Sequence, residues 1–200
     1  MAKVWIALLA LGQMLASPGW AQSAGAEPSA QAAFRAVLLK YDQRADAETD
    51  TGRLRTLASE RATELAQVLG QGLAFTGWDL ILSGTEATPM GGIFVRLHDN
   101  TLSAPRSVRP TYWNSGPGAI MRQAEISKKS PLHVPTALLK RGTMVVVSGH
   151  FFPGETGGPY FESARISAHL LEVERGRFRA PYFSIKLEEI GELFPEPRFP

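Results

Sequence analysis

The sequence predicts an α+β fold, in which a helical amino-terminal segment is followed by a five- to six-stranded antiparallel β-barrel. Residues 29–70 are rich in Ala, Leu, Glu and Arg and carry apolar side chains at helical spacing. From residue 73 onward, short runs of β-branched and aromatic residues are separated by Gly and Pro, as in strands joined by turns. The 200 residues include no cysteine, so packing rather than disulfides must stabilise this fold.

The first residues have the layout of a secretory signal peptide. One cation, Lys3, precedes an apolar run over residues 4–15 and then a helix-ending Ser-Pro-Gly. The run is shorter than the roughly 20 apolar residues that span a bilayer, so we expect removal rather than a membrane anchor. Small residues predict cleavage after Ala21, with Ala24 and Ala26 as alternatives. The expected location is therefore the periplasm or the cell exterior.

Two stretches of helical periodicity occupy residues 29–70. The first places these side chains on one face: Phe34, Val37, Leu38 and Tyr41. The second has an apolar face made of Leu54, Leu57, Ala58, Leu65, Val68 and Leu69. Asp50 or Thr51 is the expected N-cap of the second stretch. Because Gly52 weakens a helix without forbidding it, one bent helix and two separate helices both stay open.

Six later segments alternate apolar and polar side chains, as strands with one buried side do. A short helix is expected in "SPLHVPTALLKRG", between the third and fourth of them, because Pro135 fits a first helical turn and Gly142 a stop. Pro110 limits the third segment to an edge or bulged strand. The six segments are "LAFTGWDLILSG", "GGIFVRLHDN", "RSVRPTYWNSG", "TMVVVSGHFF", "PYFESARISAHLLEV" and "APYFSIKLEEI".

Three strands, a short helix and then two or more strands is the element order of the oligonucleotide/oligosaccharide-binding barrel, the OB-fold. The sequence also resembles a group of uncharacterised exported bacterial proteins with OB-like barrels, through "FTGWDLIL", "SPL…LLKRGTMVVVSGHF", and "YFESARIS" followed by "APYFSIKLEEI". The resemblance covers roughly the final two thirds of the chain and implies no catalytic motif. The helical segment from Ser29 to Leu69 and the sixth strand depart from an unadorned barrel.

The predicted organisation therefore has five parts: a signal peptide over residues 1–21, a disordered leader over 22–28, a helical segment over 29–70, an OB-like β-barrel over 73–190, and a proline-rich tail over 191–200.

The near balance of basic and acidic residues excludes a strongly basic surface. The chain carries 21 basic and 19 acidic residues, and loss of Lys3 would bring the two signs closer still to balance. Binding to a phosphate backbone draws on clustered positive charge, which only local patches of this chain could supply.

The segment "MVVVSGHFFPGE" raises the question of catalysis, because Ser148 and His150 suggest a nucleophile and its base. Two residues apart on a strand, their backbones are separated by about 6–7 Å. An activated hydroxyl and imidazole lie about 2.6–3.2 Å apart. We therefore expect no catalytic residues here, with Gly149 marking a bulge beside a packed or surface His150.

Metal and cofactor sites are not expected either. The histidines have no close spacing and no accompanying motif: His98, His133, His150 and His169. The glycines of "SGPGAI" and "PGETGGPY" are followed by no phosphate-binding lysine at the required spacing. We read those glycines as turns.

The strongest ligand-binding candidate is the cluster "RGRFRAPYF", read as a hairpin in which Arg175, Arg177 and Arg179 alternate with Gly and Phe. Arginines beside aromatic rings hold single strands on barrels of this class by charge and stacking. A second basic group, Arg106 and Arg109, precedes Tyr112 and Trp113. The predicted contact residues are Arg175, Arg177, Arg179, Trp78, Tyr112, Trp113 and Phe151.

These observations favour an exported, non-enzymatic binding or assembly module of the cell envelope, whose partner is a protein or an anionic envelope ligand. One alternative is a hydrolase or nuclease-like enzyme using Asp79, Arg96, His98 and His150. Another is the binding of single-stranded nucleic acid or an anionic glycan. Fold alone does not choose among them, because this type of barrel hosts many functions.

Overall fold

The computed structural model describes residues 29–99, 108–115, 124–153, 161–162 and 176–193. The predicted signal peptide and leader lie outside the described residues, as do Arg106, Arg175, most of the predicted fifth strand and most of the tail. Within the described ranges, neither long helix is apolar enough to cross a bilayer.

The helical segment forms two helices, α1 over Ser29–Asp46 and α2 over Thr51–Leu69. They are separate because Asp50 caps α2: its Oδ1 accepts a hydrogen bond from the backbone N–H of Arg53 at 2.6 Å. The short 3₁₀ turn η1, Gln71–Leu73, then leads into the barrel.

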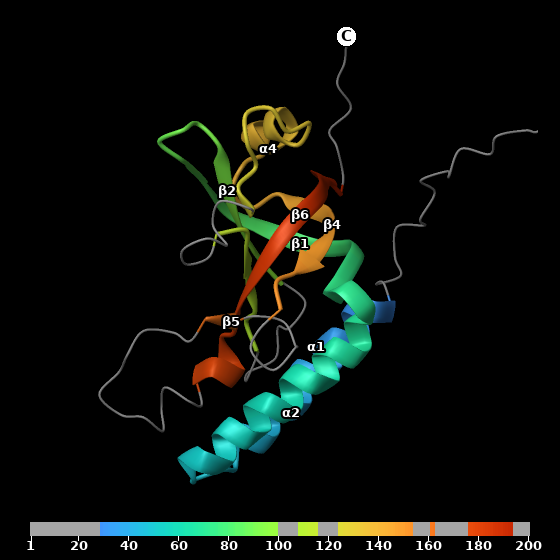
Figure 1. Ribbon diagram of the computed structural model, residues 1–200, viewed down its shortest axis with the longest axis vertical. Coiled ribbons are helices and arrows are strands. Elements are labelled where there is room, and N and C mark those ends of the chain that lie inside the picture. The colour runs from blue at the N-terminus through green and yellow to red at the C-terminus, as the bar shows by residue number, and fades with distance from the viewer. Residues whose placement is uncertain (1–28, 100–107, 116–123, 154–160, 163–175, 194–200) are drawn as a thin grey trace, which may run out of the picture.

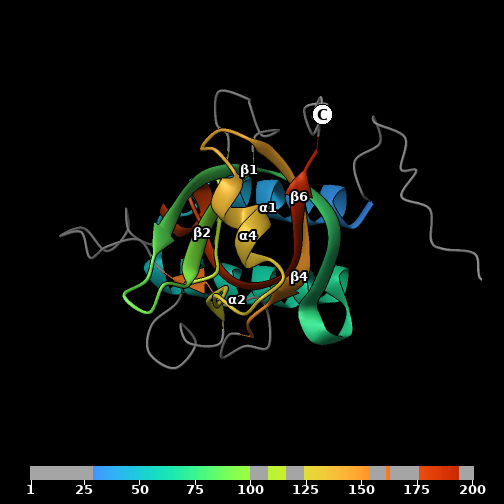
Figure 2. The same cartoon turned by 90° about the horizontal axis from the view of Figure 1, so that it is seen from above.

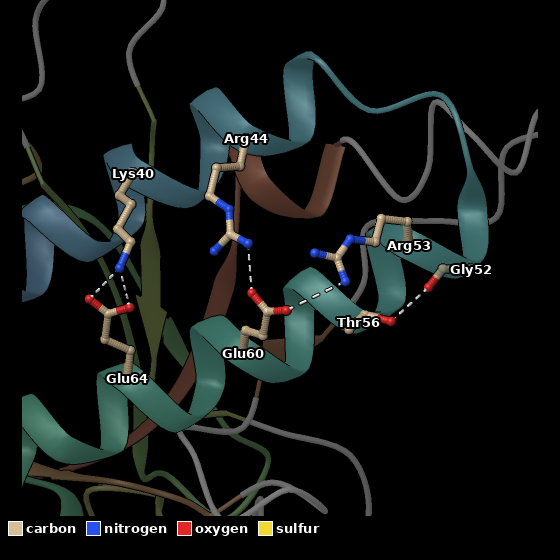
Figure 3. A network of polar contacts seen from close by, with 7 residues as sticks. All are labelled: Lys40, Arg44, Gly52, Arg53, Thr56, Glu60 and Glu64. Atoms are coloured by element: carbon tan, nitrogen blue, oxygen red, sulfur yellow. Dashed lines mark hydrogen bonds and ion pairs between the residues drawn. The ribbon is translucent and has the colours of Figure 1, made fainter.

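Ion pairs join the facing sides of α1 and α2 (Figure 3). Nζ of Lys40 contacts both carboxylate oxygens of Glu64, at 2.9 and 2.6 Å. Nη2 of Arg44 lies 2.8 Å from Glu60, whose other oxygen lies 3.7 Å from Nη1 of Arg53. Because these pairs are partly exposed to solvent, which screens them, we attribute the stability of the hairpin mainly to its buried apolar face.

The strands form one sheet that closes into a five-stranded barrel, with β1 paired to β2 and β4, β2 to β3, and β6 to β3 and β4. The prediction of a fully antiparallel barrel was wrong in one place, since β3 and β6 run parallel. The sheet is therefore mixed, and the closed barrel is compatible with an OB-like barrel. The strands are β1 Ala74–Ala87, β2 Ile93–His98, β3 Thr111–Trp113, β4 Met144–Phe151, β5 Phe161–Glu162 and β6 Tyr182–Glu192.

The two ends of the barrel are covered by helices on opposite sides (Figures 1 and 2). The predicted short helix is present as α4, His133–Leu138, between β3 and β4. The α1–α2 hairpin lies at the other end, where Phe34 of α1 is fully buried. The Phe34 ring centroid lies 5.0 Å from that of Trp78 and 5.3 Å from that of Phe151. The helical hairpin and the barrel thus share one hydrophobic core.

Two irregularities in the ladders set which side chains face inward. β1 shifts register between Phe75 and Trp78, where Gly77 has a φ of +67°. The β4–β6 ladder also shifts register between Ser148 and Gly149. The irregularity predicted at Gly149 is therefore present, but its extra residue, Glu188, lies on β6 and not on β4. A Cβ at Gly149 would overlap the carbonyl oxygen of Lys186 on β6, so the two strands approach closely there.

Candidate functional site

Three of the predicted contact residues lie in the core. Trp78, Tyr112 and Phe151 are 0%, 1% and 1% exposed. The Trp78 ring centroid lies 6.0 Å from that of Tyr112 and 5.7 Å from that of Phe151. Burial raises the pKa of the Tyr112 hydroxyl well above its ordinary value. In this conformation the three rings stabilise the barrel and do not reach a ligand outside it.

The predicted arginine hairpin is not a hairpin in its described part, because residues 176–179 form a helical turn. The carbonyl oxygen of Arg177 accepts a hydrogen bond from Nη1 of Arg61 on α2, at 3.1 Å. The Arg61 guanidinium also lies 4.5 Å from the ring centroid of buried Phe178. Nη2 of Arg179 pairs with Oδ1 of Asp46, at the end of α1. These contacts attach the helical hairpin to the start of β6.

Arg61 is fully buried at this junction. Burial lowers the pKa of its guanidinium to about 10, with the Asp42 carboxylate opposing that effect. Arg61 therefore keeps its charge at neutral pH. The arginine-rich stretch contacts α1 and α2 rather than presenting all its cations to solvent.

Trp113 is the predicted aromatic that points outward. It lies on β3 between buried neighbours, and its own side chain is half-buried. The Arg96 guanidinium of β2 lies 4.8 Å from its ring centroid, a cation–π contact between directly paired strand positions. Nη2 of Arg96 also lies 3.1 Å from Oε1 of Glu86, with both side chains largely exposed.

The outer surface around Trp113 combines cationic and aromatic side chains from three strands. Thr111 pairs with His98 on β2 and with Tyr182 on β6, so these residues form one row across the barrel wall. Arg109 is exposed and precedes this row, and its backbone N–H donates to the Arg179 carbonyl at 2.6 Å. We call this surface the β2–β3 face and define it by Arg96, His98, Arg109, Trp113 and Tyr182.

This face can hold an extended anionic chain by two means. Trp113 and Tyr182 offer ring surfaces for stacking on bases or sugar rings, and Arg96 and Arg109 offer charge. The Arg96–Glu86 pair is exposed, and such pairs contribute little, so an incoming anion can replace Glu86 at low cost.

The alternation of apolar and polar residues in β2 already predicted that Arg96 and His98 face outward, away from the buried side of the strand. It could not bring Tyr182 beside them, because that depends on the parallel pairing of β3 with β6.

The residues predicted for the enzymatic alternative do not come together in one site. His98 and His150 pair with Ile81 and Ala74 of β1, which lie seven residues apart, a span of roughly 20 Å. Nδ1 of His150 contacts Oε1 of Glu188 at 3.3 Å. Oγ of Ser148 accepts from the Gly77 N–H at 3.1 Å instead of meeting His150. Within the described ranges no group of three His, Cys, Asp or Glu side chains could hold a metal ion.

Comparison of the chain with protein-family models, with curated proteins and with solved structures gave no match.

Proposed function

We propose that this protein is an exported, non-enzymatic binding or assembly module of the cell envelope, which takes its ligand on the β2–β3 face. The observation that carries the proposal is the placement of Trp113 against Arg96 on the outside of a barrel whose inside is packed with aromatic side chains. A ligand of such a barrel binds to its wall or its ends rather than within it.

Export is supported by the sequence. The cation, apolar run and small residues before Gln22 follow the pattern of a cleaved signal peptide. The resemblance to exported bacterial proteins with OB-like barrels points the same way.

The ligand class that best suits the β2–β3 face is an extended anion, either an anionic glycan or a single strand of nucleic acid. Both present rings for stacking on Trp113 and charges for Arg96 and Arg109. For an exported protein the glycan is the more natural partner, because envelopes carry anionic glycans.

Ligand binding is tested with two labelled probes, a sulfated heparin oligosaccharide and a 15-nucleotide oligothymidine, by fluorescence anisotropy. We expect Trp113→Ala to weaken binding of the preferred probe about tenfold through loss of stacking. Arg96→Ala with Arg109→Ala should weaken binding and reduce its salt dependence. Arg53→Ala, an exposed cation on α2, is the control and should have no effect. Equal affinity of Trp113→Ala and wild type would remove the β2–β3 face as the site.

Export is tested separately. Expressed in a Gram-negative bacterium, the chain should be recovered from the periplasmic fraction with Gln22 as its first residue. Recovery from the cytoplasm with residues 1–21 still attached would contradict export while leaving the ligand test intact.

A further inference from the structure

A second exposed surface lies at the end of the barrel covered by α4, away from the α1–α2 hairpin (Figures 1 and 2). Three of its apolar side chains project into solvent: Met90 is 85% exposed, Val134 67% and Leu138 64%. Val134 and Leu138 are four residues apart on α4 and so lie on the same helical face. They leave an apolar ridge at the tip of the molecule.

Specific contacts place the β1–β2 turn beside this ridge. Nε2 of His133, the first residue of α4, donates to the carbonyl oxygen of Gly91 at 3.0 Å. Met90 precedes Gly91 and is thereby held next to the start of α4. A Cβ at Gly91 would overlap the Lys128 side chain, so Lys128 lies across the same turn.

Cations flank the ridge on both sides. Lys128 and Lys129 are exposed just before α4, and Lys140 and Arg141 are exposed just after it. Backbone hydrogen bonds between Leu82 of β1 and residues 142–143 hold the second pair against the barrel, at 2.8 and 2.9 Å.

The sequence from residue 126 to residue 154 contains no Asp or Glu. The nearest acid before it, Glu125, accepts a hydrogen bond from Thr88 Oγ1 at 2.6 Å. The surface is thus apolar at its centre and has four exposed cations around it. They outnumber the two exposed acids at the same end, Glu86 before the β1–β2 turn and Glu192 opposite Val145.

We propose that this surface, the α4 cap, docks the protein on an anionic lipid bilayer. Its charge is complementary to acidic headgroups, which attract cations at the membrane surface. Its apolar side chains protrude rather than line a pocket, which suits insertion to the depth of the acyl boundary while the lysines and arginine stay at headgroup level. The occupant is a lipid surface, and the site is separate from the β2–β3 face.

Vesicle binding tests the charge requirement. The full chain is sedimented with vesicles of phosphatidylcholine and phosphatidylglycerol at 7:3, and with phosphatidylcholine alone. We expect binding to the anionic vesicles only, and about 30-fold weaker binding for Lys140→Gln with Arg141→Gln. Arg53→Gln with Arg55→Gln makes the same charge change on α2 and should alter binding about twofold or less. An equal loss in both pairs would overturn the proposal, since any surface charge would then serve.

Insertion of the ridge is tested with a local probe. Because the chain has no cysteine, Leu138→Cys and Arg55→Cys can each carry a single polarity-sensitive fluorophore. We expect a blue shift on anionic vesicles at position 138 and none at position 55. Vesicle binding without a shift at position 138 would overturn the proposal, because another segment, such as the apolar run at residues 4–15, would then hold the lipid. Lack of any vesicle binding would also overturn the proposal, and an acidic protein would then be the expected partner of the α4 cap.

Discussion

Nε of Arg35 on α1 lies 2.6 Å from Oδ2 of Asp99, the residue that follows β2, and both side chains are buried. The same helix is joined to β1 by the Gln31 side chain, which donates to the Asp79 carbonyl at 2.9 Å and accepts from the Asp79 N–H at 3.0 Å. The amide of Gln31 therefore bonds to β1 as an adjacent strand would. Polar contacts with β1 and with the end of β2 thus fix the position of α1 against the barrel.

Breaking the Arg35–Asp99 pair from one side should be costly. Asp99→Leu leaves the Arg35 charge buried without that carboxylate, and we expect the free energy of unfolding to fall by about 3–5 kcal/mol. The double variant Arg35→Met with Asp99→Leu removes both charges and should recover most of the loss. Urea unfolding of the wild type, the single and the double variant measures this. A double variant no more stable than the single one would show that the pair itself stabilises the fold.

Helical and strand periodicity predicted most elements of this fold, because each buries one side against a common core. The apolar stripe of Phe34, Val37, Leu38 and Tyr41 is buried in α1 as predicted. Local patterns carry no information on which distant strands meet, so the parallel pairing of β3 with β6 was missed. The helical turn at residues 176–179 was missed because alternating arginines are equally compatible with a strand.

The orientation of single aromatics was less predictable, for two reasons. Phe75 and Trp78 are an odd number of residues apart and should face opposite sides of a regular strand, but the irregularity at Gly77 turns both inward. Tyr112 and Trp113 are adjacent, so one faces in and one faces out, and nothing in the sequence decides which. Of the predicted binding aromatics, only Trp113 therefore lies on the outer face.

The fit of Phe34 into the barrel predicts that the helical hairpin and the barrel unfold together. Phe34→Ala removes a ring that contacts Trp78, Tyr112, Phe151 and Phe183, and should lower the free energy of unfolding by about 3–5 kcal/mol. Met90→Ala, at an exposed position, is the control and should change stability by about 0.5 kcal/mol or less. Calorimetry should give one transition for both variants. Two separate transitions would mean that the barrel folds without its hairpin.

Asp79 should make stability depend on pH in an unusual direction. Burial raises the pKa of its carboxyl above the ordinary 3.8, and the Arg35 charge opposes this only in part. A raised pKa in the folded state means that the carboxyl favours folding in acid and that this contribution is lost as pH rises through the folded pKa. Asp79→Asn should therefore raise the melting temperature at pH 7, and the difference from wild type should vanish below pH 3.8.

Glu64 provides a comparison of opposite sign. Its hydrogen bond to Lys40 holds the pKa of its carboxyl below the ordinary 4.5, so its contribution is present above that pH and is lost as pH falls through the lowered pKa. Glu64→Gln should lower the melting temperature at pH 7 and match wild type in acid. Thermal scans from pH 2 to 8 distinguish the two variants, and a shift of the same sign for both at pH 7 would contradict this assignment.

Gly149 should be the least replaceable glycine of the β4–β6 ladder. A methyl group there would overlap the Lys186 backbone carbonyl, which cannot move without opening the pairing of β4 with β6. We expect Gly149→Ala to cost about 3 kcal/mol or to abolish folding, because overpacking against backbone has no side-chain rotamer to relieve it.

Gly191 lies in the same pair of strands, opposite Val146, but a Cβ added there would meet no atom within 4 Å. Gly191→Ala should therefore leave the free energy of unfolding unchanged or raise it by up to about 1 kcal/mol. Chemical unfolding of both variants measures the contrast. Equal stability of the two variants would mean that the bulge at Glu188, opposite Ser148 and Gly149, relaxes in solution. The bulge would then not fix the position of His150 beside Glu188.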